Sequence, residues 1–194
     1  VPKRYWRLGE TLEAESASLW DSTSNTVSEL DRRLRKAVKS RMISDVPLGA
    51  FLSGGYDSTT VVALMQQFSH KPVQTFSIGF KEKGFDEAPF AKAIAEHLNT
   101  EHTELYVTAE EAMGVIPSLA SIYDEPFADS SQIPTILVSQ LARSKVKVAL
   151  SGDGGDELFG GYNRYIIGAN LWRVLKYFPQ PVKLLLRKMI LSAP

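Results

Sequence analysis

Short apolar runs alternate with helical patterns through the middle of the sequence, and this alternation constrains the fold most strongly. The runs at 48–52, 73–80, 101–107 and 146–150 have the length and composition of strands, and the run at 48–52 is that of a buried strand. Segments with the spacing of amphipathic helices separate them. Strands that alternate with helices in this way are joined by crossovers and lie parallel. We therefore expect an α/β fold, a doubly wound parallel sheet with helices on both faces.

Several of the helical segments have recognisable first turns. Thr26 is predicted to begin the first helix, because Glu29 follows at the spacing of a capping box. Asp86 is predicted to cap a later helix that has Pro89 in its first turn, where proline is tolerated. The expected helices lie at 26–42, 58–68, 86–98, 109–122 and 131–143, with two more after residue 165.

Composition excludes several classes of function. The chain has 194 residues, with 22 Lys and Arg, 22 Asp and Glu, and no cysteine. The balanced charge gives no general attraction to nucleic acid or to an anionic membrane. The lack of cysteine excludes disulfides, cysteine-bound metals and a thiol nucleophile within this sequence. No uncharged stretch is long enough to span a bilayer, and no signal sequence is visible. We expect a cytoplasmic protein that has neither nucleic acid nor membrane as a partner.

A glycine-rich loop, Ser53-Gly54-Gly55-Tyr56-Asp57-Ser58, lies between the first expected strand and the next helix. Paired glycines let the backbone approach a ligand closely, and the N–H groups of such a loop converge with the positive end of the helix, as in phosphate sites. The hydroxyls of Ser53 and Ser58 add donors. Because the sequence has no lysine of the Walker type, the loop suits a pyrophosphate that is held together with Mg²⁺. A plain turn capped by Asp57 or Ser58 is the alternative.

A second glycine-rich loop, Ser151-Gly152-Asp153-Gly154-Gly155-Asp156-Glu157, follows the last expected strand. Three acids within five residues are costly unless a cation lies among them. In doubly wound sheets, ligands bind beyond the carboxyl ends of the strands, where the strand order reverses. If the first and last strands are neighbours at that point, Asp57 and Asp156 face one crevice and share a Mg²⁺. A solvated acidic turn that caps a helix is the alternative.

Four segments are recognisable together: SGGYDS after VPLGAFL, SIGF, YDEPFADSS, and KVALSGDGGDELFGGYNRY. They closely resemble the synthetase domain of the glutamine-hydrolysing asparagine synthetases, which are PP-loop ATP pyrophosphatases with the adenine nucleotide alpha hydrolase-like fold. The similarity runs from about Asp45 to Tyr165. It implies that the side-chain carboxylate of aspartate attacks the α-phosphorus of ATP and releases pyrophosphate. Ammonia then displaces AMP from the aspartyl-adenylate and gives asparagine.

The resemblance also implies roles for individual residues. The pyrophosphate would be cradled by Ser53, Gly54, Gly55, Asp57 and Ser58, and adenosine would be contacted by Leu52, Ile78, Ser151 and Gly152. Asp57 and Asp156 would bind Mg²⁺. Asp153 holds a position tied to the aspartyl-adenylate step, where the best-known members have the longer Glu. We expect Asp57, Asp153 and Asp156 to be the catalytic acids.

The expected cofactors are ATP and Mg²⁺, and the expected substrates are aspartate, or another carboxylate, and ammonia. The resemblance implies that a glutaminase domain of the same full-length chain supplies the ammonia. One alternative is a related PP-loop amidotransferase or β-lactam synthetase that acts on another carboxylate. A second alternative is a nucleotide-binding homologue without catalysis. The oligomeric state stays open, with a homodimer among the alternatives.

The sequence divides into three expected regions. Residues 1–24 are an irregular lead-in, 25–165 form the ATP-binding PP-loop synthetase domain, and 166–194 begin a helical region that is truncated. Because the sequence starts at Val1 and ends at Pro194 with no initiating methionine, we expect it to be a piece of a longer chain that lacks the glutaminase domain and the C-terminal end.

Overall fold

The computed structural model describes residues 4–11, 23–81, 86–126 and 128–191. Four strands form one sheet in these ranges, and every neighbouring pair is parallel. The strands are β1 (Leu48–Phe51), β2 (Gln74–Phe80), β3 (Glu101–Val107) and β4 (Val148–Leu150). They match the four apolar runs of the sequence, so the predicted parallel α/β sheet is confirmed.

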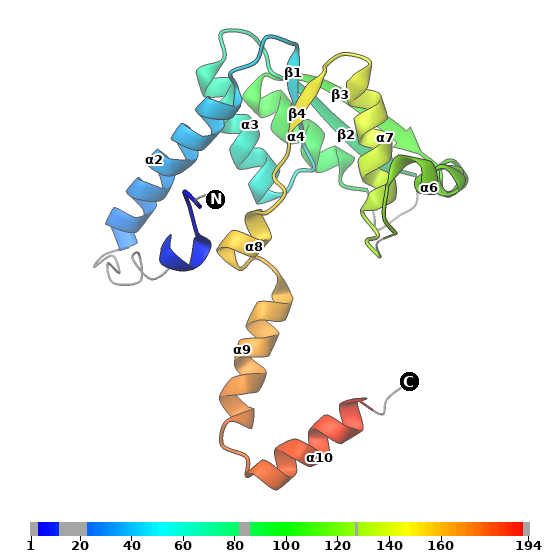
Figure 1. Ribbon diagram of the computed structural model, residues 1–194. Helices are drawn as coiled ribbons and strands as arrows, with labels where there is room; N and C mark the ends of the chain where they lie inside the picture. The colour runs from blue at the N-terminus through cyan, green and yellow to red at the C-terminus, as the bar shows by residue number, and fades with distance from the viewer. Residues whose placement is uncertain (1–3, 12–22, 82–85, 127, 192–194) are drawn as a thin grey trace.

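Helices cover both faces of the sheet. Figure 1 shows α7 on the opposite side from α2 and α3, and α4 packs on β2 and β3. The helices of the sheet region are α2 (Thr23–Arg41), α3 (Tyr56–Phe68), α4 (Ala88–Leu98), α5 (Ala109–Met113), α6 (Leu119–Ile122) and α7 (Gln132–Arg143). The doubly wound arrangement is therefore also confirmed.

The core forms two layers because side chains alternate along each strand. Ala50 and Leu52 are buried on the face that α2, α3 and α4 cover, where Val62 and Met65 pack against them. On the other face, the fully buried Phe76 packs against two further buried residues, Ala142 in the last turn of α7 and Val146 in the segment between α7 and β4. The two layers hold the central strand β1 rigidly, so the loop that leaves it has a fixed starting point.

The strand order is β3-β2-β1-β4, so the direction of winding reverses between β1 and β4. The chain runs from β1 through α3 to β2 and through α4 to β3, whereas β4 pairs with the other edge of β1. Gly49 lies opposite Ala149 and Ala50 opposite Leu150 in this pairing. The two glycine-rich loops therefore leave adjacent strands at the point where ligands bind in folds of this class.

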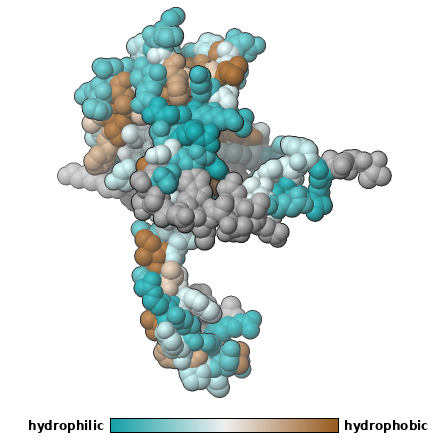
Figure 2. Space-filling view, turned by 90° about the vertical axis from the view of Figure 1, so that its left-hand side faces the viewer, coloured by the Kyte–Doolittle hydropathy of each residue, from teal (hydrophilic) through white to brown (hydrophobic). Residues whose placement is uncertain are grey.

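Beyond the sheet, α8 (Gly155–Phe159) leads to α9 (Asn163–Leu175) and α10 (Gln180–Leu191). Figure 1 shows α9 and α10 extending away from the sheet as an arm. No residue of α9 is buried, and Ile167, Leu171 and Trp172 are more than half exposed. Brown apolar and teal polar residues accordingly intermix along the arm in Figure 2. No described helix is both long enough and apolar enough to cross a membrane.

Two predicted helices differ from the observed ones. The predicted helix at 109–122 is wrong as a continuous element, because α5 ends at Met113 and a 3₁₀ turn, Ile116–Ser118, separates it from α6. Gly114 caps α5, and Pro117 has no N–H to continue the ladder of hydrogen bonds. The helix predicted from Thr26 begins at Thr23 instead. Its Glu29 binds the guanidinium groups of Arg32 and Arg33 rather than completing a capping box.

A third helix begins slightly later than predicted. Helix α4 starts at Ala88 with Glu87 as the residue before it, and Pro89 lies in the first turn as expected. Asp86 nevertheless accepts a hydrogen bond from the N–H of Ala88 at 3.2 Å. The predicted capping side chain thus acts at this helix start, from one residue further back.

Candidate active site

The first glycine-rich loop joins β1 to α3 and presses against α4. Gly54 has a φ of +87°, a conformation that other residues rarely adopt. A Cβ at this position would lie 2.9 Å from Phe90 Cβ and 3.0 Å from the backbone nitrogen of Ala91. The turn of the loop and its contact with α4 therefore both require glycine here.

Two serine hydroxyls shape this loop from within. Ser53 Oγ and Ser58 Oγ lie 3.0 Å apart, and Ser58 Oγ also accepts a hydrogen bond from the N–H of Ser53 at 3.3 Å. The N–H of Gly55 donates to Ser53 Oγ at 3.3 Å. Ser58 is buried. Its hydroxyl therefore holds the loop closed, in addition to lining the cavity beside it.

The second glycine-rich loop packs directly on the first. A Cβ at Gly152 would lie 2.5 Å from the backbone nitrogen of Ser58, and one at Gly155 would overlap the carboxylate of Asp57. Gly154 has a φ of +91° and turns the chain into α8. Glycines at these positions let the two loops touch, and they bring the carboxylate of Asp57, in the first turn of α3, against the start of α8.

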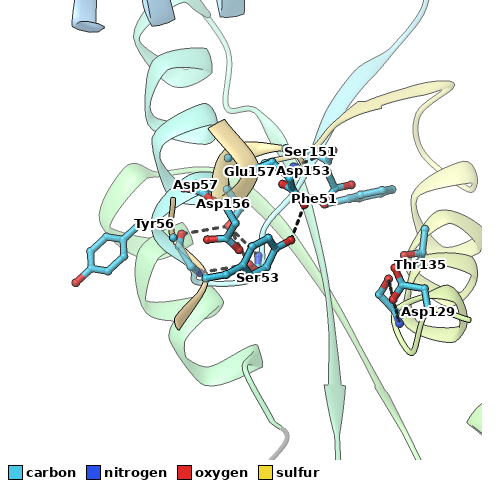
Figure 3. Close-up of a pocket in the computed structure, with 18 residues that line it drawn as sticks. Phe51, Ser53, Tyr56, Asp57, Asp129, Thr135, Ser151, Asp153, Asp156 and Glu157 are labelled. Atoms are coloured by element: carbon cyan, nitrogen blue, oxygen red, sulfur yellow. Dashed lines mark hydrogen bonds between the residues drawn. The ribbon is translucent and has the colours of Figure 1, made fainter. Parts of the chain in front are cut away.

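The two loops line one cavity of about 900 Å³. Asp57, Asp153, Asp156 and Glu157 all face it, and Figure 3 shows the side chains of Asp57 and Asp156 close together. No Lys or Arg is among the described residues that line this cavity. The predicted crevice between Asp57 and Asp156 is therefore present, and its charge is negative.

The opposite wall of the cavity comes from the start of α7. Asp129, Ser131 and Thr135 line it there, and Figure 3 shows Asp129 and Thr135 across the cavity from the glycine-rich loops. Ser131 donates to Asp129 Oδ1 through its N–H and its hydroxyl, both at 2.8 Å. These hydrogen bonds lower the pKa of Asp129, which favours the ionised form.

A smaller, more apolar cavity of about 310 Å³ continues from the first. Phe51, Ser53 and Thr135 line both cavities, so the two meet at the end of β1. Leu52 and Ile78 line the smaller one, together with Phe76, Phe80 and Val138. Together the cavities combine a polar compartment with an apolar one, as binding a nucleotide requires.

The structure divides the nine predicted ATP-binding residues between these two spaces. Ser53, Gly55, Asp57, Ser58, Ser151 and Gly152 line the larger cavity, and Leu52, Ser53 and Ile78 line the smaller one. Gly54 lines neither, because it faces α4. Ser151 and Gly152 were expected beside adenosine, and they lie in the polar cavity.

Other residues of the site had no predicted role, among them Phe51, Thr135 and Tyr162. The Tyr162 hydroxyl donates to Glu157 Oε1 at 2.6 Å. This hydrogen bond lowers the pKa of Glu157 and raises that of Tyr162. The spacing of Asp129 and Ser131 is a sequence signal that points to a local turn, whereas no periodic pattern marks Tyr162.

Comparison with models of known families shows to which family the chain belongs. The profile of the family described as Asparagine synthase matches residues 29–193. The chain belongs to the asparagine synthase family. The matched range includes both glycine-rich loops and the whole sheet, so the parallel fold and the paired loops are features of an asparagine synthase domain.

Individual relatives agree with this membership. A protein of Methanocaldococcus jannaschii is 48% identical over 143 residues, which are 73% of this chain and 28% of the relative. Asparagine synthetase [glutamine-hydrolyzing] 1 of Bacillus subtilis is 43% identical over 139 residues, 72% of this chain and 22% of the relative. The chain thus spans about a quarter of the length of these relatives.

Among solved structures, NMN synthetase from Francisella tularensis is similar in fold. It has a TM-score of 0.49 and 18% sequence identity, and the match covers 70% of this chain and 58% of that chain.

Proposed function

We propose that this chain is the ATP-binding part of an enzyme that converts aspartate to asparagine through an aspartyl-adenylate. One observation carries the proposal: two glycine-rich loops meet at the reversal of strand order and place Asp57 and Asp156 in one cavity. Family membership supports the same reaction class, since the Bacillus subtilis relative is named as a glutamine-hydrolysing asparagine synthetase.

The nucleotide would lie along both cavities. Its phosphates would meet the N–H groups of the loop before α3, whose first turn supplies the positive end of a helix dipole. Its adenosine would enter the apolar cavity beside Leu52 and Ile78. Phe51, at the junction, would separate the polar part of the nucleotide from the base.

A divalent cation fits the donors of the larger cavity. The described lining holds five carboxylates and no basic side chain, so a bound polyphosphate would add negative charge that nothing in the lining offsets. Carboxylate oxygens are the ligands that Mg²⁺ prefers, and it commonly takes one or two of them together with phosphate oxygens.

No group of three His, Asp or Glu residues is arranged as a complete metal site in the described part of the chain. We therefore assign the metal to Asp57 and Asp156, with phosphate oxygens completing the shell. When bound, Mg²⁺ would offset the charge that develops on the departing pyrophosphate.

The protein would contribute mainly by positioning the reactants and excluding water. The side-chain carboxylate of aspartate attacks the α-phosphorus, the bond from that phosphorus to the bridging oxygen breaks, and pyrophosphate leaves. Ammonia then attacks the acyl carbon, AMP leaves, and the nitrogen loses a proton. We assign Asp153, which faces the same cavity, to the adenylate step, and we place the source of ammonia in a glutaminase domain of the full-length protein.

Exchange of labelled pyrophosphate into ATP tests this proposal in the full-length protein. We expect exchange that depends on both aspartate and Mg²⁺, and no exchange with other carboxylates such as glutamate or a sugar acid. Exchange that depends only on a different carboxylate would replace aspartate as the substrate. Binding of ATP without any exchange would support a non-catalytic homologue instead.

Two variants connect the exchange to the site. Asp57→Asn keeps the size of the side chain but removes its charge, so we expect a loss of exchange of at least about 100-fold, as for other groups that stabilise transition-state charge. Asp45→Asn makes the same change at an exposed position outside the cavity and should leave exchange unchanged. Equal activities of the two variants would argue against the role of Asp57.

A further inference from the structure

Glu157 and Tyr162 are joined by a short hydrogen bond beside the acids of the larger cavity. The Tyr162 hydroxyl donates to Glu157 Oε1 at 2.6 Å, and both residues line the cavity that contains Asp57 and Asp156. Hydrogen bonds to an ionised carboxylate are stronger than those between neutral groups. Tyr162 is also the residue directly before α9. The hydrogen bond therefore connects the start of the arm, at α9, to the second glycine-rich loop, which we call the acidic loop.

This hydrogen bond spans a tight reversal of the chain. Helix α8 ends at Phe159 and is capped by Gly160, which has a φ of +68°. The N–H groups of Gly160 and Gly161 both donate to the carbonyl oxygen of Asp156. The reversal brings Gly161 so close that a Cβ there would overlap Asp156 Oδ1. Gly161 thus limits the orientations that the carboxylate of Asp156 can adopt.

The ring of Tyr162 has two further contacts. The guanidinium carbon of Arg164 lies 4.0 Å from the centre of the ring, in a cation–π arrangement. The ring of Tyr165 lies 5.7 Å away, centre to centre, at an angle of 54°. These contacts leave the hydroxyl of Tyr162 directed at Glu157, and they come from α9, the first helix of the arm.

We propose that Tyr162 is a positioning residue for the metal site. Its hydrogen bond to Glu157 holds the reversal closed, the closed reversal keeps Gly161 against Asp156, and Asp156 is thereby fixed in the orientation that binds Mg²⁺ with the pyrophosphate. Tyr162 acts through Asp156 and needs no contact with the reacting atoms. This inference rests on the proposed function, because it concerns the metal that the reaction uses.

Calorimetric titration of Mg²⁺ tests the inference without turnover. The full-length protein is saturated with an ATP analogue that has a methylene group between the α- and β-phosphorus and cannot be cleaved there. Tyr162→Phe removes only the hydroxyl, and we expect its affinity for Mg²⁺ to fall about 10-fold or more, the effect of one lost hydrogen bond to a charged group. Tyr165→Phe is the matched control, because its hydroxyl bonds to no residue that the structure describes. Its affinity should equal that of the unmodified protein.

Substitutions of Glu157 separate positioning from other roles of Tyr162. Glu157→Ala should reproduce the loss seen in Tyr162→Phe, and Glu157→Gln, which keeps an acceptor oxygen, should lose less. The double variant Tyr162→Phe/Glu157→Ala should be no weaker than either single variant, since both remove the same bond. Unchanged affinity for Mg²⁺ in Tyr162→Phe, or additive losses in the double variant, would overturn this inference and leave the proposed function standing. If the unmodified protein itself binds no Mg²⁺ with the analogue, the proposed function fails and this inference fails with it.

Discussion

At the scale of single residues, the acidic loop depends on glycines that have no room for a side chain. Gly152 lies against the backbone of Ser58, and Gly155 lies against the carboxylate of Asp57. These contacts set the separation between the two loops, and with it the spacing of the acids that we assign to Mg²⁺. On the opposite side of the first loop, Gly54 lies against Phe90 and Ala91 and so sets the distance between this loop and α4.

Gly152→Ala tests this close packing. The added Cβ would lie 2.5 Å from the backbone nitrogen of Ser58, so one of the loops must shift. We expect the free energy of unfolding to fall by about 1–3 kcal/mol, the usual cost of overpacking, and binding of ATP to weaken because the cradle is displaced. Chemical denaturation and calorimetry measure the two effects.

Gly168→Ala is the control for this substitution. Gly168 lies within α9, and a Cβ there meets nothing within 4 Å. Alanine is the better helix former, so this variant should be about 0.5–1 kcal/mol more stable, with unchanged binding of ATP. Normal stability and normal binding in Gly152→Ala would show that the loops do not need their close contact.

At the scale of elements, a histidine joins β2 to β3 beneath α4. His102 Nδ1 lies 2.9 Å from the hydroxyl of Thr75, and Nε2 lies 3.1 Å from that of Ser77. The side chain is 10% exposed. Burial lowers the pKa of His102, and Lys92 lowers it further, whereas Glu104 acts in the opposite direction without reversing the shift.

This pairing of strands should make stability depend on pH. Because the pKa of His102 is lower in the folded chain than its ordinary value of about 6.5, the unfolded chain binds the proton more readily. Stability is therefore unaffected well above pH 6.5 and falls as the pH decreases below that value. We expect His102→Gln to reduce this slope, as measured by chemical denaturation between about pH 7 and pH 5.

His70→Gln provides the comparison, because His70 is exposed after α3. It should keep the slope of the unmodified protein. A slope that is the same in His102→Gln and in the unmodified protein would mean that other groups set the pH dependence.

The elements themselves were largely predictable from local pattern. The strand predicted at 101–107 has those bounds in the structure, because turn residues flank it on both sides. The prediction of one helix at 109–122 was wrong because it gave more weight to the apolar spacing than to Gly114 and Pro117. These two residues interrupt the helix in the structure. The start of the first helix was predicted three residues too late, at Thr26 instead of Thr23. A capping pattern inside a helix has the same sequence as one at a helix start, so the pattern alone does not separate the two.

At the scale of the whole molecule, the site depends on contacts that local pattern does not contain. Both glycine-rich loops could be identified in the sequence, but their contact could be predicted only if β1 and β4 are neighbours in the sheet. The structure shows that these two strands are paired. Asp57 and Asp156 could therefore be predicted together only conditionally. The wall formed by Thr135 and the bond from Tyr162 to Glu157 come from the packing of α7 and from the chain reversal after α8, and neither leaves a periodic signal.

The two cavities meet at Phe51, and in the proposed reaction this junction is where the α-phosphorus of ATP would meet the attacking carboxylate. With phosphates in the polar cavity and adenosine in the apolar one, the α-phosphorus would lie near the junction. The bond that breaks would then be the one between the α-phosphorus and the pyrophosphate.

The most direct test follows an oxygen atom. The full-length protein is incubated with ATP, Mg²⁺, ammonia and aspartate that carries ¹⁸O in its side-chain carboxylate, and the products are analysed by mass spectrometry. Attack on the α-phosphorus predicts that one labelled oxygen appears in AMP and that pyrophosphate remains unlabelled. Label in inorganic phosphate, or asparagine formed without label in AMP, would contradict attack of the carboxylate on the α-phosphorus.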